Sequence, residues 1–195
     1  MKTRILMVSA AALALGACGG ADETDTMATD NVAIDAGNEM AIDDTAAGVP
    51  ASGQEYATMA SASDLYEIES ARLAMEKSEN SGIDELAQMI VTDHEKSTAD
   101  LMTAAQQAQP PITVTPEMNA EQQANMEALR AADAATFDST YLQQQVMAHQ
   151  KALDMVRGYA QSGEVPSLQQ HASTVAGPIQ QHLDRARQLL EQPAQ

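Results

Sequence analysis

The chain has 195 residues, with 10 Lys and Arg against 28 Asp and Glu, and its formal charge of −18 excludes functions that need a basic surface, such as nucleic-acid binding. A single Cys excludes an internal disulfide and any metal site built from several thiolates. Aromatic residues make up only 3%, which argues against a large β-sandwich, whereas abundant Ala, Gln, Met, Glu and Leu favour helices. The composition predicts a small acidic helical domain and no particular activity.

Residues 1–18 have the pattern of a bacterial lipoprotein signal. Lys2 and Arg4 precede an apolar stretch of about ten residues, half the length of a membrane-spanning helix. The stretch ends in Leu-Gly-Ala-Cys, where Cys18 is the residue to be acylated, and Gly19 in place of Asp favours the outer membrane. The alternative is an ordinary secretory signal with a chance Cys. The sequence therefore predicts an outer-membrane lipoprotein that faces the periplasm, with the membrane as its partner through Cys18.

Residues 19–53 are acidic, contain no Lys or Arg, and show neither helical nor strand periodicity. Such a segment buries too little apolar area to offset the entropy lost on ordering. We expect a disordered tether that holds the rest of the chain away from the lipid. A calcium site is the alternative, but Asp43 and Asp44 lack the loop glycine and the terminal Glu of such sites.

Residues 54–195 carry helix signals throughout. Ser52 and Glu55 form a capping box, Ser81 is a candidate cap after a break, and Pro116 stands at a first helical position. Pro178 lies inside the last segment and is expected to kink it or split it in two. The expected helices cover about 54–80, 83–107, 116–132, 137–161 and 166–191.

The apolar positions of the long segments recur at alternating spacings of three and four, which is the pattern of helices packed in an antiparallel bundle. Short turns near 81–82 and 162–165 join two pairs of helices, and residues 108–136 form the long connection with a short helix of its own. The predicted fold is all-α, a ferritin-like four-helix bundle of two antiparallel hairpins.

Three histidines, His94, His149 and His182, occupy inward-facing positions on three different helices, whereas His171 lies one position off its seam and is expected to be exposed. Glu67 and His94 are equally distant from a turn centred near 80–81, so they are expected to face each other. One carboxylate and three imidazoles form a plausible set of ligands for a divalent transition metal.

The alternative interpretation is structural, with each histidine hydrogen-bonded inside the core to a neighbour such as Asp93, Asp138, Tyr141 or Glu67. The Glu-x-x-His motif of di-iron bundles is absent, because Val91, Val146 and Ile179 stand three residues before the histidines. The twelve methionines show no Met-x-x-Met cluster and are expected to fill the core.

Three spaced segments resemble a known family: LAQMIVTDH at 86–94, FDSTY at 137–141 before His149, and GPIQQHL at 177–183. With the Glu-Ile pair at 67–68, they are similar to the bacterial domain of unknown function number 4142, often labelled a predicted outer membrane protein. The resemblance covers about 54–191 and implies a ferritin-like fold and an envelope location, but no activity. Gly177 departs from the family, where Leu is usual, and is expected to cost some packing.

No enzyme class is predicted, because the sequence lacks a nucleophile elbow and a glycine-rich phosphate loop. The expected function is that of a lipid-anchored envelope bundle with a structural or partner-binding role. The alternative is a protein that binds or buffers a divalent transition metal, and an oxidoreductase built on the same residues is a weaker alternative.

Overall fold

Five helices dominate residues 48–191, the part of the chain that this computed structural model describes. They are α1 (Gly53–Lys77), α2 (Ser81–Gln107), α3 (Ala120–Ala131), α4 (Phe137–Ser162) and α5 (Pro166–Leu190). No strand occurs among these residues, which confirms the all-α prediction. The predicted signal segment with Cys18 and Gly19, and the acidic segment up to residue 47, lie outside the described residues.

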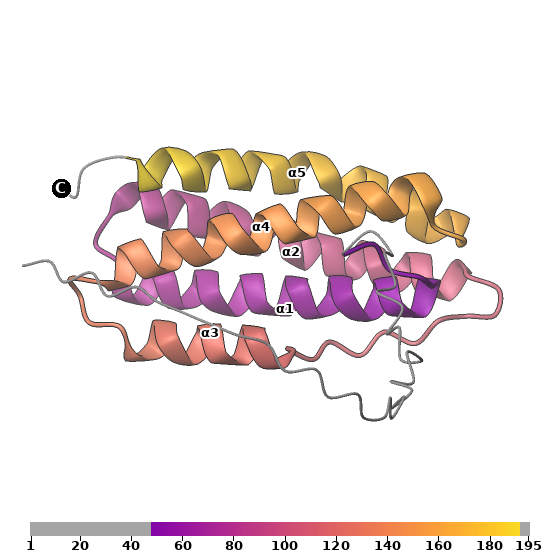
Figure 1. Cartoon of the computed structure of the whole chain (residues 1–195), viewed down its shortest axis with the longest axis horizontal. Helices are drawn as coiled ribbons and strands as arrows, with labels where there is room; N and C mark the ends of the chain where they lie inside the picture. Colours follow the sequence, from indigo (N-terminus) through magenta and orange to yellow (C-terminus); the bar gives the residue numbers. More distant parts are fainter. Residues whose placement is uncertain (1–47, 192–195) are drawn as a thin grey trace, which may run out of the picture. The chain divides into compact units, whose positions relative to one another are not determined.

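The four long helices form a bundle of two hairpins, α1 with α2 and α4 with α5 (Figure 1). Helix α2 also packs against α5, and α1 packs against α4. The connection from α2 to α4 returns along the bundle and carries α3, which lies against α1 and α4. This is the predicted topology. Within the described residues, no helix is long and apolar enough to cross a membrane.

The first hairpin turns earlier than the sequence suggested. Helix α1 ends at Lys77 rather than near residue 80, and Ser78 to Asn80 form the turn. The cap of α2 is Asn80, not Ser81, because the Asn80 Oδ1 accepts a hydrogen bond from the Gly82 N–H at 2.9 Å. The centre of the turn therefore lies at Glu79, which changes the residues that face each other across the hairpin.

Helix α3 begins four residues later than the predicted start at Pro116. Asn119 caps it in a full capping box, in which the Asn119 side chain binds the Gln122 N–H and the Gln122 side chain binds the Asn119 N–H. A cap that satisfies two free N–H groups outweighs a proline that only pre-sets one backbone angle.

Helix α5 continues through Pro178 as one element, so of the two outcomes expected at this proline, a kink or a split, the split does not occur. Proline removes the hydrogen bond to the Thr174 carbonyl, but the packed apolar face of α5 holds the helix on both sides. A side chain on the residue before a helical proline would crowd the ring, and Gly177 has none. Apart from its two neighbours in the chain, an added Cβ at Gly177 would meet nothing within 4 Å, so this position faces open space.

The bundle begins slightly before the predicted boundary at residue 54. Ser52 caps α1 by accepting a hydrogen bond from the Glu55 N–H, as predicted, and Gly53 is the first helical residue. Pro50 is buried, and a Cβ on Gly158 would clash with Val49, which lies directly against it. Residues 49–53 are therefore packed on the bundle.

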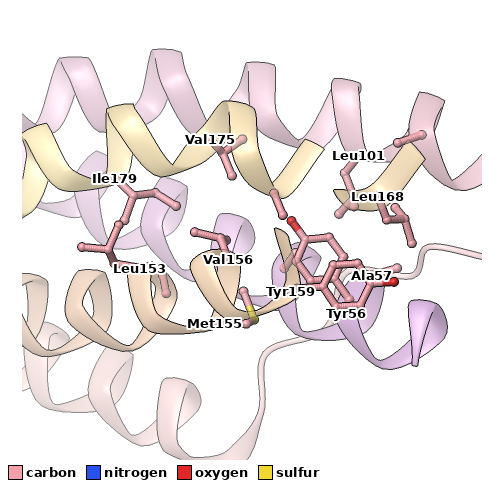
Figure 2. Close-up of a cluster of buried hydrophobic side chains, with 14 of the residues drawn as sticks. Tyr56, Ala57, Leu101, Leu153, Met155, Val156, Tyr159, Leu168, Val175 and Ile179 are labelled. Atoms are coloured by element: carbon pink, nitrogen blue, oxygen red, sulfur yellow. The ribbon is translucent and has the colours of Figure 1, made fainter. Parts of the chain in front are cut away.

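The core consists of two apolar clusters separated by a polar layer. One cluster surrounds the stacked rings of Tyr56 and Tyr159 (Figure 2). The other surrounds Ile83, Tyr141 and Leu189 at the opposite end of the bundle. Between them lie buried polar groups, which cost free energy unless they are paired. This polar layer contains Asp64, Glu67, Ser70, His94, Ser97, Gln145, His149 and His182.

Candidate metal centre

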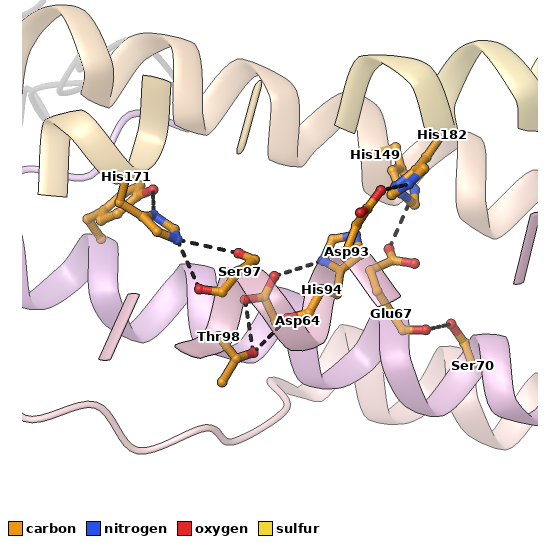
Figure 3. A network of polar contacts seen from close by, with 11 residues as sticks. Asp64, Glu67, Ser70, Asp93, His94, Ser97, Thr98, His149, His171 and His182 are labelled. Atoms are coloured by element: carbon orange, nitrogen blue, oxygen red, sulfur yellow. Dashed lines mark hydrogen bonds and ion pairs between the residues drawn. The ribbon is translucent and has the colours of Figure 1, made fainter. Parts of the chain in front are cut away.

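His94, His149 and His182 meet in the middle of the bundle and are called the triad below (Figure 3). They project from α2, α4 and α5, and each residue is at most 3% exposed. One ligand nitrogen from each lies within 4.8 Å of those of the other two, and the ring centroids are 5.3 to 5.7 Å apart. The structure thus brings together the three histidines that the sequence singled out.

The partner of His94 is Asp64 on α1. The His94 Nδ1 lies 2.7 Å from the Asp64 Oδ1, and the other Asp64 oxygen accepts a hydrogen bond from Thr98 at 3.1 Å. Asp64 and His94 are equally far along the chain from Glu79, the true centre of the turn. The turn was expected one or two residues later, near 80–81, and that centre places Glu67 opposite His94.

His149 and His182 are also held by one partner each. The His149 Nδ1 lies 3.0 Å from the Gln145 backbone carbonyl, one turn earlier on α4. The His182 Nε2 lies 3.0 Å from the Oδ2 of Asp93, whose side chain is 40% exposed. Both partners are acceptors, so each of these ring nitrogens is the one that carries the proton.

The three hydrogen bonds determine where the free lone pairs point. A neutral imidazole has one N–H and one lone pair, and Asp64, Gln145 and Asp93 each take the N–H. The lone pairs then lie on the Nε2 of His94, the Nε2 of His149 and the Nδ1 of His182. The His94 Nε2 is buried without a hydrogen-bond partner. The other two nitrogens face each other at 3.3 Å, and with these two tautomers neither carries a hydrogen.

That arrangement matches the requirements of a bound cation. Two lone pairs at 3.3 Å repel unless a proton or a metal ion lies between them. Two nitrogens bound to a tetrahedral ion at about 2.0–2.1 Å are separated by about 3.3 Å. In metal sites each ligating histidine donates its other N–H to a carboxylate, a carbonyl or a water, as all three do here.

Glu67 lies beside the triad but is not within the group of mutually close donor atoms. Its Oε1 is 3.7 Å from the His149 Nδ1, and both carboxylate oxygens are buried without a hydrogen-bond partner. Burial raises the pKa of Glu67 to about 7, although the nearby His94 lowers it. At neutral pH this buried group next to the triad is therefore divided between its neutral and its charged form.

The surroundings of the triad act differently on each imidazole. Burial and the two neighbouring histidines hold the pKa of His149 well below its ordinary value. Burial and His94 lower the pKa of His182 to about 4. Burial also lowers the pKa of His94, but the hydrogen bond and charge of Asp64 outweigh it and the net shift is upward. His149 and His182 are therefore neutral at neutral pH, which is the form that binds metals.

His171 forms a separate buried cluster, so its predicted exposure is wrong. It is 5% exposed, its Nδ1 lies 2.7 Å from the Tyr56 hydroxyl, and its Nε2 lies 3.1 Å from the Ser97 carbonyl. The hydroxyl donates to Nδ1 while Nε2 donates to the carbonyl, so both ring nitrogens are satisfied. A strict alternation of three and four residues does not allow for the width of the buried face of α5.

The remaining predicted residues have different surroundings. Asp93 contacts His182, whereas Asp138 and Tyr141 form no hydrogen bond with the triad among the described residues. Tyr141 is fully buried, and its hydroxyl has no partner. Sequence reasoning missed Asp64 as a site residue, although it lies only three residues before Glu67 on α1. Correct placement of the turn is the signal that identifies it.

The sequence matches the family model "Domain of unknown function (DUF4142)" over residues 39–189. The chain belongs to this family. No curated protein matches the sequence.

Among solved structures, the chain is similar to CopM in its Cu(I)-bound form, with 21% identity and a TM-score of 0.59 over 70% of this chain and 94% of CopM. For the Cu(II)-bound form the identity is 20% and the TM-score 0.61, over 72% of this chain and 96% of CopM. For the silver-bound form the identity is 20% and the TM-score 0.56, over 70% of this chain and 93% of CopM. At this identity the likeness shows a shared fold.

Proposed function

We propose that this DUF4142 protein binds one transition-metal ion through the His94 Nε2, the His149 Nε2 and the His182 Nδ1. The observation that carries the proposal is the 3.3 Å contact between the His149 Nε2 and the His182 Nδ1, while the other nitrogen of each ring contacts an acceptor. A purely structural histidine uses both ring nitrogens, as His171 does. The triad leaves three lone pairs without a hydrogen-bond donor on residues that are almost fully buried.

The donor set favours copper over most other ions. Imidazole suits Cu, Zn, Fe and Ni, and Cu²⁺ is the most tightly bound of the divalent ions in the series. Asp64 and Glu67 place two buried carboxyl groups within the polar layer, and a bound cation would favour their charged forms. The fold shared with CopM, solved with Cu(I), Cu(II) and silver bound, supports the same class of ligand.

We further propose that the protein acts in the bacterial envelope as a lipoprotein. The support is the charged and apolar leader that ends in Leu-Gly-Ala-Cys, with Cys18 as the acylated residue and Gly19 as an outer-membrane sorting signal. Two or more acyl chains give lasting attachment. A metal-binding bundle in this position would hold ions on the periplasmic side of the membrane. Mass spectrometry of the mature N-terminus tests this, and an unacylated N-terminus elsewhere would contradict it.

Metal titration of the protein itself tests the proposed site. The chain is purified without a histidine tag, stripped with a chelator and titrated with Cu²⁺, Zn²⁺ and Ag⁺ in calorimetry. We expect one ion per chain, with Cu²⁺ bound most tightly, and an affinity that falls as acid protonates the ligands. Removing the ion with the chelator should lower the melting temperature. Absence of saturable binding by all three ions at neutral pH would refute the proposal.

A further inference from the structure

A cavity of about 130 Å³ between α2 and α5 joins the triad to the surface. Two triad residues, His94 and His182, line it together with Asp93, whose side chain is 40% exposed. The triad itself is almost fully buried, so an ion needs a route of this kind to reach it. The cavity of about 340 Å³ between α1, α3 and α4 contains no triad residue.

The cavity presents oxygen donors at its outer part and nitrogen donors at its inner end. Asp93 and Asp100 contribute carboxylates, and Asp100 is paired with Lys96 at the rim. Pro178 has no N–H, so the carbonyl of Thr174 lacks its usual helical donor, and both residues line the cavity. At the inner end the buried Nε2 of His94 has no partner.

His182 connects the two regions. Its Nε2 donates to Asp93, which lines the cavity, while its Nδ1 faces His149 in the triad. Asp93 is thus the carboxylate of the site that solvent reaches, whereas Asp64 and Glu67 are at most 5% exposed. Hydrated divalent cations prefer oxygen ligands, and imidazole replaces water once the ion is partly dehydrated.

From this arrangement we propose that the α2–α5 cavity is the loading vestibule of the metal centre. A hydrated divalent cation binds first to the carboxylate of Asp93 and then passes to His182 and His94. The inference rests on the proposed function, because it concerns how the same site is filled. The occupant is the free aqua ion, and delivery by a partner protein would be a different outcome of the test.

Obstruction of the vestibule tests the route separately from the site. Thr174 is exposed and lines the cavity, whereas its neighbour Ser173 is exposed and does not. Thr174→Trp should slow both uptake and release of Cu²⁺ by tenfold or more, because a steric plug raises one barrier for both directions. The dissociation constant should change much less than either rate. Ser173→Trp, the matched control, should keep the rates of the parent protein.

Asp93→Asn provides a second test. Loss of the exposed charge should lower the uptake rate by about tenfold at low salt, with the difference shrinking as salt screens the charge. Asp100→Asn, which removes a carboxylate that Lys96 already neutralises, should have a smaller effect.

The rates are measured by stopped-flow fluorescence, with the full chain and free Cu²⁺. The parent protein contains no Trp, so quenching of tyrosine fluorescence is followed in it and in the Asn variants, and quenching of the introduced Trp in the two Trp variants. If the parent protein binds Cu²⁺ and neither Thr174→Trp nor Asp93→Asn slows uptake, the vestibule is refuted while the metal centre stands. The vestibule is also refuted if uptake of free Cu²⁺ is slow and neither Thr174→Trp nor Asp93→Asn changes it, which would indicate delivery by a partner protein. If the parent protein binds no ion, the proposed function itself fails.

Discussion

Two buried histidine clusters both include residues of α2 and α5, and they differ in what their ring nitrogens have left to bind. His171 exchanges hydrogen bonds with Tyr56 and Ser97 and has no free lone pair. Each histidine of the triad donates its N–H to one acceptor, namely Asp64, Gln145 or Asp93, and its lone pair points toward the other two rings. Burial alone therefore does not identify a metal ligand, whereas an unused lone pair beside a second one does.

The largest expected effect comes from His149→Ala. In the parent protein, metal at a hundred times its dissociation constant should add about 2.7 kcal/mol to the free energy of unfolding. Without His149 the three-ligand site is lost, and this gain should disappear. Denaturant unfolding with and without Cu²⁺ measures it.

His171→Gln is the matched control for removing a buried histidine. It should lower the stability of the apo protein by about 1–3 kcal/mol, because the Tyr56 hydroxyl loses a buried partner. The gain from metal should remain. If His149→Ala and His171→Gln lost the stabilisation by metal equally, the two clusters would not differ in their ability to bind a metal ion.

A second effect is expected at Asp64, the partner that orients His94. Asp64→Asn should weaken metal binding by about 10–100-fold, as is usual when a carboxylate behind a ligating histidine is removed. The pKa of His94 should fall, because Asp64 is what raises it against the effect of burial. Calorimetry gives the affinity and NMR titration of the imidazole gives the pKa. An unchanged affinity would remove Asp64 from the site.

Glu67→Gln should act in opposite directions on the apo and metal-bound protein. Burial raises the pKa of Glu67 from 4.5 to about 7, so its contribution to apo stability is greatest below pH 4.5 and is lost as pH rises to about 7. The Gln side chain does not ionise, so the apo variant keeps this stability and should be more stable than the apo parent protein at pH 7.5. Cu²⁺ affinity should fall by about tenfold, an energy of about 1.4 kcal/mol.

Denaturant unfolding of both apo proteins at pH 4.5 and 7.5 measures the first effect, because the triad's own titration is common to both. A variant that is less stable than the parent protein at pH 7.5 would show that Glu67 is structural.

The sequence predicted the fold well because helix periodicity is strong and the four long segments are bounded by Gly, Ser or Pro. It placed His94, His149 and His182 on inner faces for the same reason. It missed Asp64 because turn centres depend on cap geometry, here Asn80, and a shift of one or two residues changes which side chain faces the histidine. The direction of a lone pair follows from hydrogen-bond partners, which only the structure supplies.

The smallest effect concerns the end of the bundle that holds Tyr56 and His171. Ser52 caps α1 one turn before Tyr56, and Val49 packs on Gly158. The sequence had assigned 19–53 to a dispensable tether, so a chain that begins at residue 54 tests this boundary. Compared with a chain that begins at residue 48, it should lose about 1 kcal/mol or more, the usual value of an N-cap.

Cu²⁺ affinity should be the same for both chains, because the apolar cluster around Tyr56 and Tyr159 separates the triad from this end of the bundle. Ser52→Ala in the longer chain is the matched control and should reproduce the part of the loss that comes from the cap. Equal unfolding midpoints of the two chains would restore the boundary at 54. A parallel loss of Cu²⁺ affinity would show that the two histidine clusters are coupled through α1 and not independent.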